Sequence, residues 1–192
     1  MIQSKADLLR YIDQDDAQFA GHCPGLMSWI MKNENWHIRQ YKLHMRKSEY
    51  YHNVPTAGGG GLMRRLLSAY HRFRYERLGA YLHYSIKLNT CGPGLQLYHT
   101  GARIAVKHGT TLGADCTLLE GVVFGKKTGE GIEPQRVGDH CFFGTGAKVL
   151  GELNIGHHVT VGANSVVTHD LPDGAVAAGA PARVIRIMKT ED

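Results

Sequence analysis

Large apolar residues recur at six-residue intervals through the second half of the chain. They are Val106, Leu112, Leu118, Phe124, Val137, Phe143, Val149, Ile155, Val161 and Val167, with one break between Phe124 and Val137. An α-helix repeats every 3.6 residues and a strand every 2, so neither element has this period. The period instead predicts a coil of short flat strands joined by tight turns, in which stacked coils satisfy each other's backbone hydrogen bonds.

Two further positions repeat with the apolar one. Glycine follows it at Gly113, Gly125, Gly138, Gly144, Gly156 and Gly162. The fifth position is small or β-branched at Thr110, Cys116, Val122, Cys141, Ala147, Val159 and Ser165, with Leu153 and Leu171 as exceptions. We expect the small residue to fit where the chain bends, and glycine to relieve the turn geometry. The four cysteines form no C-x-x-C pair, which argues against a zinc site and a disulfide scaffold.

The break in the repeat predicts a loop. Thirteen residues separate Phe124 from Val137 where the period requires six, so a seven-residue excursion leaves the coil at about 126–136. A loop ejected from a rigid scaffold is a natural position for function. The alternative is a solvated insertion.

The first 84 residues have a different composition, with both tryptophans and eight of the nine tyrosines. A capping box from Ser4 to Asp7 predicts a short helix, and a second helical pattern covers about 26–47. A third covers 62–82, with Leu66, Ala69, Tyr70, Phe73 and Leu78 at helical spacing among Arg64, Arg65, Arg72, Arg74 and Arg77. We expect this helix to pack on the coil with a solvated basic face; the alternative is peripheral contact with a membrane surface or a polyanionic glycan.

The charge and the N-terminus restrict the function classes. A net charge of +5 permits an acidic partner such as a phosphorylated ligand without naming one. Nothing in the sequence suggests specific recognition of a nucleic acid. The N-terminus lacks the apolar core of a signal peptide and no apolar run reaches membrane-spanning length, so the expectation is a cytoplasmic protein without an integral membrane segment.

Two stretches carry a resemblance to a known family. The run from Val161 to Ile185 resembles the closing segment of hexapeptide-repeat acyltransferases, and Asn89 to Leu95 (Asn-Thr-Cys-Gly-Pro-Gly-Leu) is similar to the serine acetyltransferase-like proteins of polysaccharide gene clusters. The resemblance covers about 85–187. It implies a mainly β fold, with a left-handed parallel β-helix over 85–192 after an α-helical region over 1–84. It also implies a homotrimer with the acyl-CoA site between neighbouring prisms. The handedness comes from the resemblance alone, since parallel crossovers are otherwise right-handed.

The resemblance also nominates catalytic residues. The family's catalytic histidine falls in a segment matched by Leu97 to Gly101, so His99 is the candidate general base for an acceptor hydroxyl. Glu120 is a candidate to orient His99, and its alternative role is to cap a turn. Two positions depart from serine acetyltransferases. Ser85 stands where they have an aspartate, and the loop reads Ile132-Glu133-Pro134 where they have Arg-His-Pro.

Acetyl-CoA is the implied co-substrate. The residues expected to bind it are Gly144, Gly146, Ala147, Lys148, Gly162, Ala163, Ala178, Gly179, Arg183 and Arg186. The small residues leave room for pantetheine, and the three cations suit the phosphates of CoA; each cation has a solvated surface charge as its alternative. No metal is expected, because His108, His140, His157, His158 and His169 do not form the His-x4-His pair of a zinc site.

These observations predict an acetyl-CoA-dependent O-acetyltransferase whose acceptor is a saccharide hydroxyl in surface-polysaccharide synthesis. The alternative within the class is L-serine, in cysteine biosynthesis. An alternative of another class is a non-catalytic trimeric β-helix that serves as an interaction scaffold.

Overall fold

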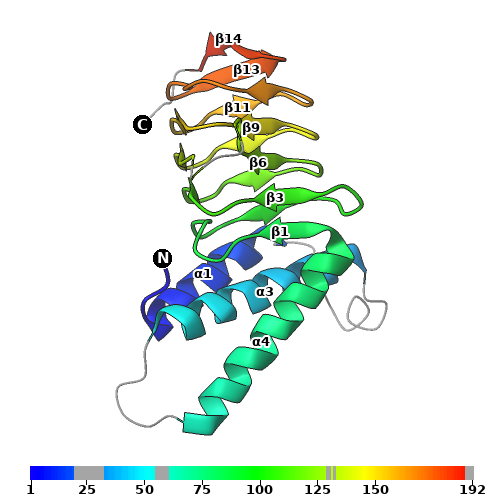
Figure 1. The fold of residues 1–192 in the computed structure, drawn as a ribbon, viewed down its shortest axis with the longest axis vertical. Helices are drawn as coiled ribbons and strands as arrows, with labels where there is room; N and C mark the ends of the chain where they lie inside the picture. Colours follow the sequence, from blue (N-terminus) through cyan, green and yellow to red (C-terminus); the bar gives the residue numbers. More distant parts are fainter. Residues whose placement is uncertain (20–32, 55–60, 129–130, 132, 189–192) are drawn as a thin grey trace.

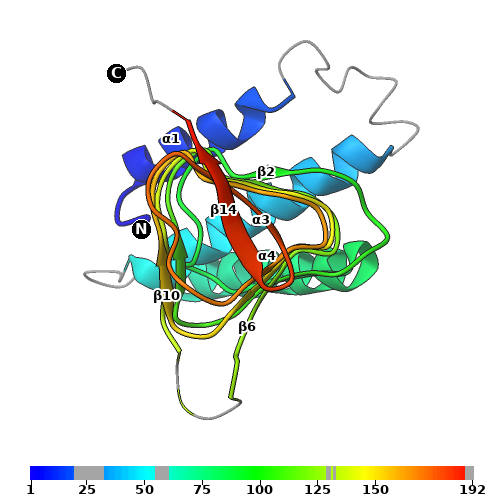
Figure 2. The same ribbon diagram turned by 90° about the horizontal axis from the view of Figure 1, so that it is seen from above.

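The computed structural model describes residues 1–19, 33–54, 61–128, 131 and 133–188. Within these ranges, three helices lie at one end of the molecule, and the later residues wind upward from them as a stack of coils (Figure 1). Viewed along its axis, the stack is a prism with three flat sides (Figure 2).

The helices are α1 (Lys5–Ala17), α3 (Glu34–Asn53) and α4 (Gly61–Leu82). The predicted capping box is confirmed, since the Ser4 side chain accepts the Asp7 N–H at 3.0 Å. The helix expected over 26–47 is shifted: α3 begins after its N-cap Asn33, whose side chain accepts the Trp36 N–H, and it continues to Asn53. Positions 26–32 of that prediction lie outside the described residues.

Short strands make up the prism, and they form three sheets. The first contains β1 (Tyr84–Ile86), β3 (Ile104–Val106), β6 (Val123–Gly125), β9 (Lys148–Leu150) and β12 (Val166–Val167). The second contains β4 (Thr110–Leu112), β7 (Gln135–Val137) and β10 (Leu153–Ile155). The third contains β2 (Gln96–Leu97), β5 (Thr117–Leu118), β8 (Phe142–Phe143), β11 (Thr160–Val161), β13 (Ala175–Gly179) and β14 (Ala182–Ile187). All pairings are parallel except that of β13 with β14, which crosses the top of the prism (Figure 2).

The six-residue period is confirmed as the core of this prism. All ten apolar residues of the repeat are 6% exposed or less. The fifth-position residues from Thr110 to Leu171 are buried as well, including Cys116 and Cys141. Each side of a coil therefore contributes one large apolar side chain to the interior and one small side chain to the bend.

A buried ion cluster joins the helices to the base of the prism. Arg46 of α3 is fully buried and donates to Asp15 of α1 through Nε, at 2.8 Å, and to Glu49 through Nη1, at 3.1 Å. It also donates to the carbonyls of Cys91, at 2.9 Å, and Gly92, at 2.6 Å. Because the cluster spans α1, α3 and the first coil, it fixes the position of the helices relative to the prism.

The stretch from Asn89 to Leu95 is where the helices attach. The Glu49 carboxylate accepts the Asn89 N–H at 2.8 Å, and the Asp15 carboxylate accepts the Leu95 N–H at 2.9 Å. Lys42 donates to the carbonyl of Leu95 at 3.0 Å. Burial lowers the pKa of Lys42 to about 8, although Asp15 acts in the opposite direction. The motif that carries the family resemblance is thus the contact surface of the helices.

Helix α4 differs from its prediction. We expected its apolar residues to pack on the coil, but Leu66, Tyr70 and Phe73 are 55%, 52% and 60% exposed. Its C-terminal part meets the prism, through buried Leu78 and through the Tyr75 hydroxyl, which donates to the Ile86 carbonyl. The N-terminal part does not, because the helix runs away from β1 and beyond the base (Figure 1). Periodicity identified one face of the helix correctly, but not whether that face is covered.

Between β6 and β7 the chain leaves the outline of the prism, as the break in the repeat predicts (Figure 2). Gln135 anchors its return. This side chain is fully buried, accepts from Thr110 Oγ1 at 2.9 Å, and donates through Nε2 to the carbonyls of Gly125, Val149 and Gly151 at 2.9–3.0 Å. The excursion therefore closes without leaving buried carbonyls unpaired at that corner.

Candidate functional site

His99 lies in a lengthened corner of the prism. Leu97 is in register with Leu118, and Val106 is in register with Phe124. On the lower coil, Leu97 and Val106 are nine positions apart. On the coil above, their partners Leu118 and Phe124 are six positions apart. The corner between β2 and β3 therefore holds three residues more than the corner above it, and His99 is among them.

Two contacts brace the backbone at His99, which has a positive φ of 59°. The Tyr84 hydroxyl donates to the His99 carbonyl at 2.9 Å, and the Glu34 carboxylate accepts the Thr100 N–H. Burial, together with the Glu34 and Glu120 carboxylates, raises the pKa of the Tyr84 phenol, so its hydroxyl stays protonated and able to donate. A left-handed conformation is uncommon outside glycine and is retained where surrounding contacts impose it.

The His99 side chain itself is exposed, and within the described part of the chain its ring makes no hydrogen bond. It lines a cavity of about 360 Å³ together with Gln18, Phe19, Glu34, Asn35 and Tyr98. An imidazole fixed by its backbone but free at its ring nitrogens is suited to take a proton from a bound hydroxyl.

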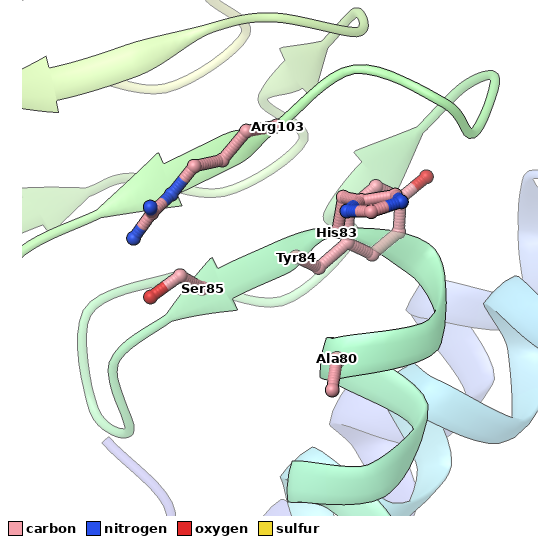
Figure 3. Close-up of a pocket in the computed structure, with 6 residues that line it drawn as sticks. Ala80, His83, Tyr84, Ser85 and Arg103 are labelled. Carbon is pink, nitrogen blue, oxygen red and sulfur yellow. The ribbon is translucent and has the colours of Figure 1, made fainter.

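A second cavity, of about 300 Å³, lies where the end of α4 meets β1. It is lined by Gly79, Ala80, His83, Tyr84, Ser85 and Arg103, and Figure 3 shows the Arg103 side chain extending toward the side where Ser85 lies. Ser85, the position of the family aspartate, thus lines this cavity, and among the described residues no hydrogen bond joins it to His99. Arg103 was not identified from the sequence.

Glu120 occupies the corner one coil above His99. Its Oε1 accepts from Thr145 Oγ1 at 3.0 Å, and its buried Oε2 has no hydrogen-bond partner among the described residues. No hydrogen bond joins Glu120 to His99 in that part of the structure. Glu120 therefore contacts the corner above it, and its role in orienting His99 stays a prediction.

The small residues expected to bind CoA lie above His99 on the same edge of the prism. Leu97, Leu118, Phe143, Val161 and Ala177 are in register in successive coils. The corners that follow these residues contain, in order, His99, Glu120, Gly144 to Ala147, Gly162 with Ala163, and Ala178 with Gly179. With a spacing of about 4.8 Å per coil, the edge extends about 19 Å upward from His99.

Close packing explains the glycines on this edge. A Cβ at Gly144 would lie 2.7 Å from the Ala163 nitrogen. Gly146 has a φ of 72°, and a Cβ there would lie 2.3 Å from Asn164 Oδ1. Gly144 and Gly146 therefore allow successive coils to stack closely at this edge, and these two positions add no side chain to it.

The three cations predicted for the CoA phosphates differ in availability. Lys148 already donates to the corner carbonyls of Gly121, at 2.6 Å, and Gly146, at 2.9 Å. Arg183 is exposed and pairs with Ala178, at the top of the edge. Arg186 is also exposed but pairs with Val176, further along β13. Arg183 is therefore the best placed of the three.

The loop presents the carboxylate of Glu133, at the position where the resemblance places the histidine of serine acetyltransferases. Glu133 accepts the backbone N–H groups of Lys127, at 2.6 Å, and Thr128, at 3.0 Å, and also the Thr128 hydroxyl. These hydrogen bonds, with that from the Thr128 side chain the strongest, lower the pKa of Glu133 to about 2. Ile132 lies outside the described residues. The Glu133 carboxylate therefore holds the two sides of its own loop together by hydrogen bonds.

Two features bear on metals and membranes. No group of three or more histidine, cysteine or acidic side chains suited to a metal ion occurs within the described ranges. None of the helices described combines the length and the hydropathy needed to cross a bilayer.

Sequence comparisons find relatives that match about half of the chain. The chain is 41% identical over 96 residues to a serine acetyltransferase of Helicobacter pylori (strain J99), and 36% identical over 95 residues to one of Haemophilus influenzae. Each alignment covers 49% of this chain, but 55% and 35% of the two relatives. This chain therefore aligns with about half, or less, of the length of these relatives. The chain is therefore similar to serine acetyltransferases over about half of its own length.

Solved structures of serine acetyltransferases share the fold of nearly the whole chain. Serine acetyltransferase of Neisseria gonorrhoeae matches with a TM-score of 0.68 and 22% identity, over 97% of this chain and 70% of that one. The Brucella abortus enzyme in complex with coenzyme A matches with a TM-score of 0.68 and 20% identity, over 96% and 70%. The predicted left-handed parallel β-helix behind an α-helical region is thereby confirmed. No family model matches the chain.

Proposed function

We propose that this protein is an acetyl-CoA-dependent O-acetyltransferase with His99 as its general base. The observation that carries the proposal is the position of His99, at the foot of the prism edge whose small residues leave room for the pantetheine arm. The His99 ring takes the proton of an acceptor hydroxyl while the oxygen attacks the thioester carbonyl. The tetrahedral adduct then collapses, and the imidazolium returns the proton to the leaving thiolate of CoA.

Two acceptors remain to be separated. The names of the relatives favour L-serine. A saccharide hydroxyl, in the manner of the polysaccharide-cluster proteins that the chain resembles, is the second candidate. Glu133 favours it, because its carboxylate is hydrogen-bonded within the loop at the position where the serine acetyltransferases that the chain resembles have a histidine. We also propose a homotrimer, in which a neighbouring prism closes the cleft along the exposed edge.

The test measures thiol release from acetyl-CoA in the presence of L-serine or of individual sugars. His99→Ala should lower the rate at least about 100-fold while leaving CoA binding intact, because general-base catalysis contributes roughly 10²–10⁴-fold. His108→Ala is the matched control, since His108 is also an exposed histidine but lies at a different corner.

Each outcome has a distinct meaning. An unchanged rate in His99→Ala would remove the proposed base. Turnover with L-serine and none with sugars would assign serine as acceptor, and the reverse would assign a saccharide. If the unmodified protein shows no CoA binding and no turnover with any acceptor, that result would favour the non-catalytic scaffold.

A further inference from the structure

A third cavity, of about 490 Å³, lies among the helices and away from the proposed acetyl-transfer site. Its lining residues come from α1 (Lys5, Leu8), α3 (Lys47, Tyr50, Tyr51) and α4 (Met63, Arg64, Leu67, His71). Its volume lies within the range of roughly 300–1,000 Å³ that small-molecule sites occupy. Nothing in the proposed acetyl transfer uses it.

The polar part of this cavity is cationic. Lys5, Lys47 and Arg64 line it, and none of its described lining residues is acidic. Within the described part of the chain, Lys5 and Lys47 form no ion pair or hydrogen bond, and Arg64 donates only to the Val54 carbonyl. Three positive charges without a carboxylate partner around one cavity create a site for an anion.

Two buried histidines beside the cavity, His71 and His44, also lie in positively charged surroundings. His71 lines the cavity, and its Nδ1 lies 2.8 Å from Nδ1 of His44. Burial and the Lys47 charge lower the pKa of His71. The pKa of His44 is likewise lowered by burial and by cationic neighbours, and no acidic residue is among its perturbing groups.

The rest of the cavity is aromatic and apolar. The Arg64 guanidinium lies over the rings of Tyr50, at 5.3 Å, and Tyr51, at 5.0 Å, which holds its planar fork in place. Met63 and Leu67 form part of the wall and are 69% and 38% exposed. At 100° per residue they lie between the cavity and the exposed apolar row of α4 that includes Leu66, so the apolar surface continues out of the cavity.

We propose that this cavity binds an organic phosphate that carries an apolar body. The phosphate lies against Lys5, Lys47 and Arg64, and the apolar body extends along Met63 and Leu67. A planar, stacked guanidinium with two ammonium groups suits a dianionic phosphate better than a single carboxylate. The ligand is either a soluble phosphate ester or the head group of a membrane lipid.

Calorimetric titration of the intact protein with decyl phosphate tests the site, with inorganic phosphate and neutral decyl maltoside as comparison probes. Decyl phosphate should bind more tightly than either. Lys47→Gln should weaken its binding about tenfold, equivalent to about 1.4 kcal/mol. Met63→Gln should weaken the binding of decyl phosphate but not that of inorganic phosphate. Arg77→Gln, on the exposed side of the same helix, is the matched control and should change neither.

Vesicle flotation separates the two sources. Co-flotation with phosphatidic acid vesicles, absent with phosphatidylcholine and reduced in Lys47→Gln, assigns the ligand to a membrane; decyl phosphate binding without flotation assigns it to solution. The proposal is overturned if decyl phosphate does not bind, if decyl maltoside binds equally well, or if Arg77→Gln weakens binding as much as Lys47→Gln. Since every readout is binding, the result is independent of acetyl transfer.

Discussion

Replacing Arg46 by methionine tests the ion cluster that joins the helices to the prism. The substitution removes the guanidinium and leaves two carboxylates, those of Asp15 and Glu49, whose side chains are only 3% and 2% exposed. Removing one partner of a buried ion pair costs about 3–5 kcal/mol, because the remaining charge is buried without compensation. The carbonyls of Cys91 and Gly92 also lose their donor, which adds to the cost.

Urea unfolding monitored by tryptophan fluorescence measures this loss in the helical region, because both tryptophans precede residue 84. Arg46→Lys should lose less, since it keeps the charge but not the forked geometry. Arg72→Met is the control: its pair with Glu76 is more than half exposed and is worth at most about 1 kcal/mol. A change below 1 kcal/mol in Arg46→Met would refute the assignment of the cluster as the main attachment.

The same variant has a functional readout. Glu34, at the start of α3, accepts the Thr100 N–H beside His99, so the position of α3 affects the corner that holds the proposed base. Loosening α3 should lower the turnover of acetyl transfer while leaving the affinity for CoA unchanged, because the CoA edge lies higher on the prism. Loss of CoA affinity in parallel with turnover would indicate general unfolding instead.

Three further predictions concern stability and can be measured by urea unfolding. Gln135→Leu should lower the free energy of unfolding by about 3 kcal/mol, because three buried carbonyls lose their donor. A decrease below 1 kcal/mol would show that these carbonyls have another hydrogen-bond donor. Gly146→Ala should lose about 2 kcal/mol through its positive φ and the clash with Asn164, whereas alanine at exposed Gly131, with φ 58° and open space, should show only the backbone part. Burial, then His71, lowers the pKa of His44 to about 4. In the unfolded chain His44 takes up a proton near pH 6.5, whereas in the folded chain it stays neutral until about pH 4. The free energy of unfolding should therefore fall by about 2 kcal/mol as the pH drops to 5, and by less in His44→Gln.

The six-residue period predicted the prism interior because its cause is local. A coil with three flat sides requires one large inward residue on each side, so Val106 to Val167 mark the core without any knowledge of distant contacts. His99 was found through resemblance, and the period alone gave no reason to choose it. Its supports, Tyr84 and Glu34, were missed because Tyr84 contacts His99 across 15 residues and Glu34 contacts Thr100 across 66, and no local pattern predicts such contacts.

Misplaced expectations have the same origin. Helical spacing grouped Leu66, Tyr70 and Phe73 on one face, but only the geometry of α4 shows that this face is uncovered. For Glu120 the spacing identified the corner, and the hydrogen bond that its carboxylate accepts comes from Thr145, one coil above; its role in orienting His99 stays a prediction. Sequence spacing therefore gives the corner that a side chain occupies, but not which neighbouring corner it contacts.

The first coil explains why the candidate base lies at the foot of the prism. Each coil satisfies the backbone groups of the next, but the first has no coil below it and would leave an open sheet edge. Helical side chains take that place: Arg46 donates to Cys91 and Gly92, and Lys42 donates to Leu95. Side chains follow an irregular backbone more readily than a strand does, so this coil accommodates a corner three residues longer than the one above it. Because no coil lies below the first one, helical side chains must pair with its backbone groups. For the same reason this coil can have the longer corner that carries His99.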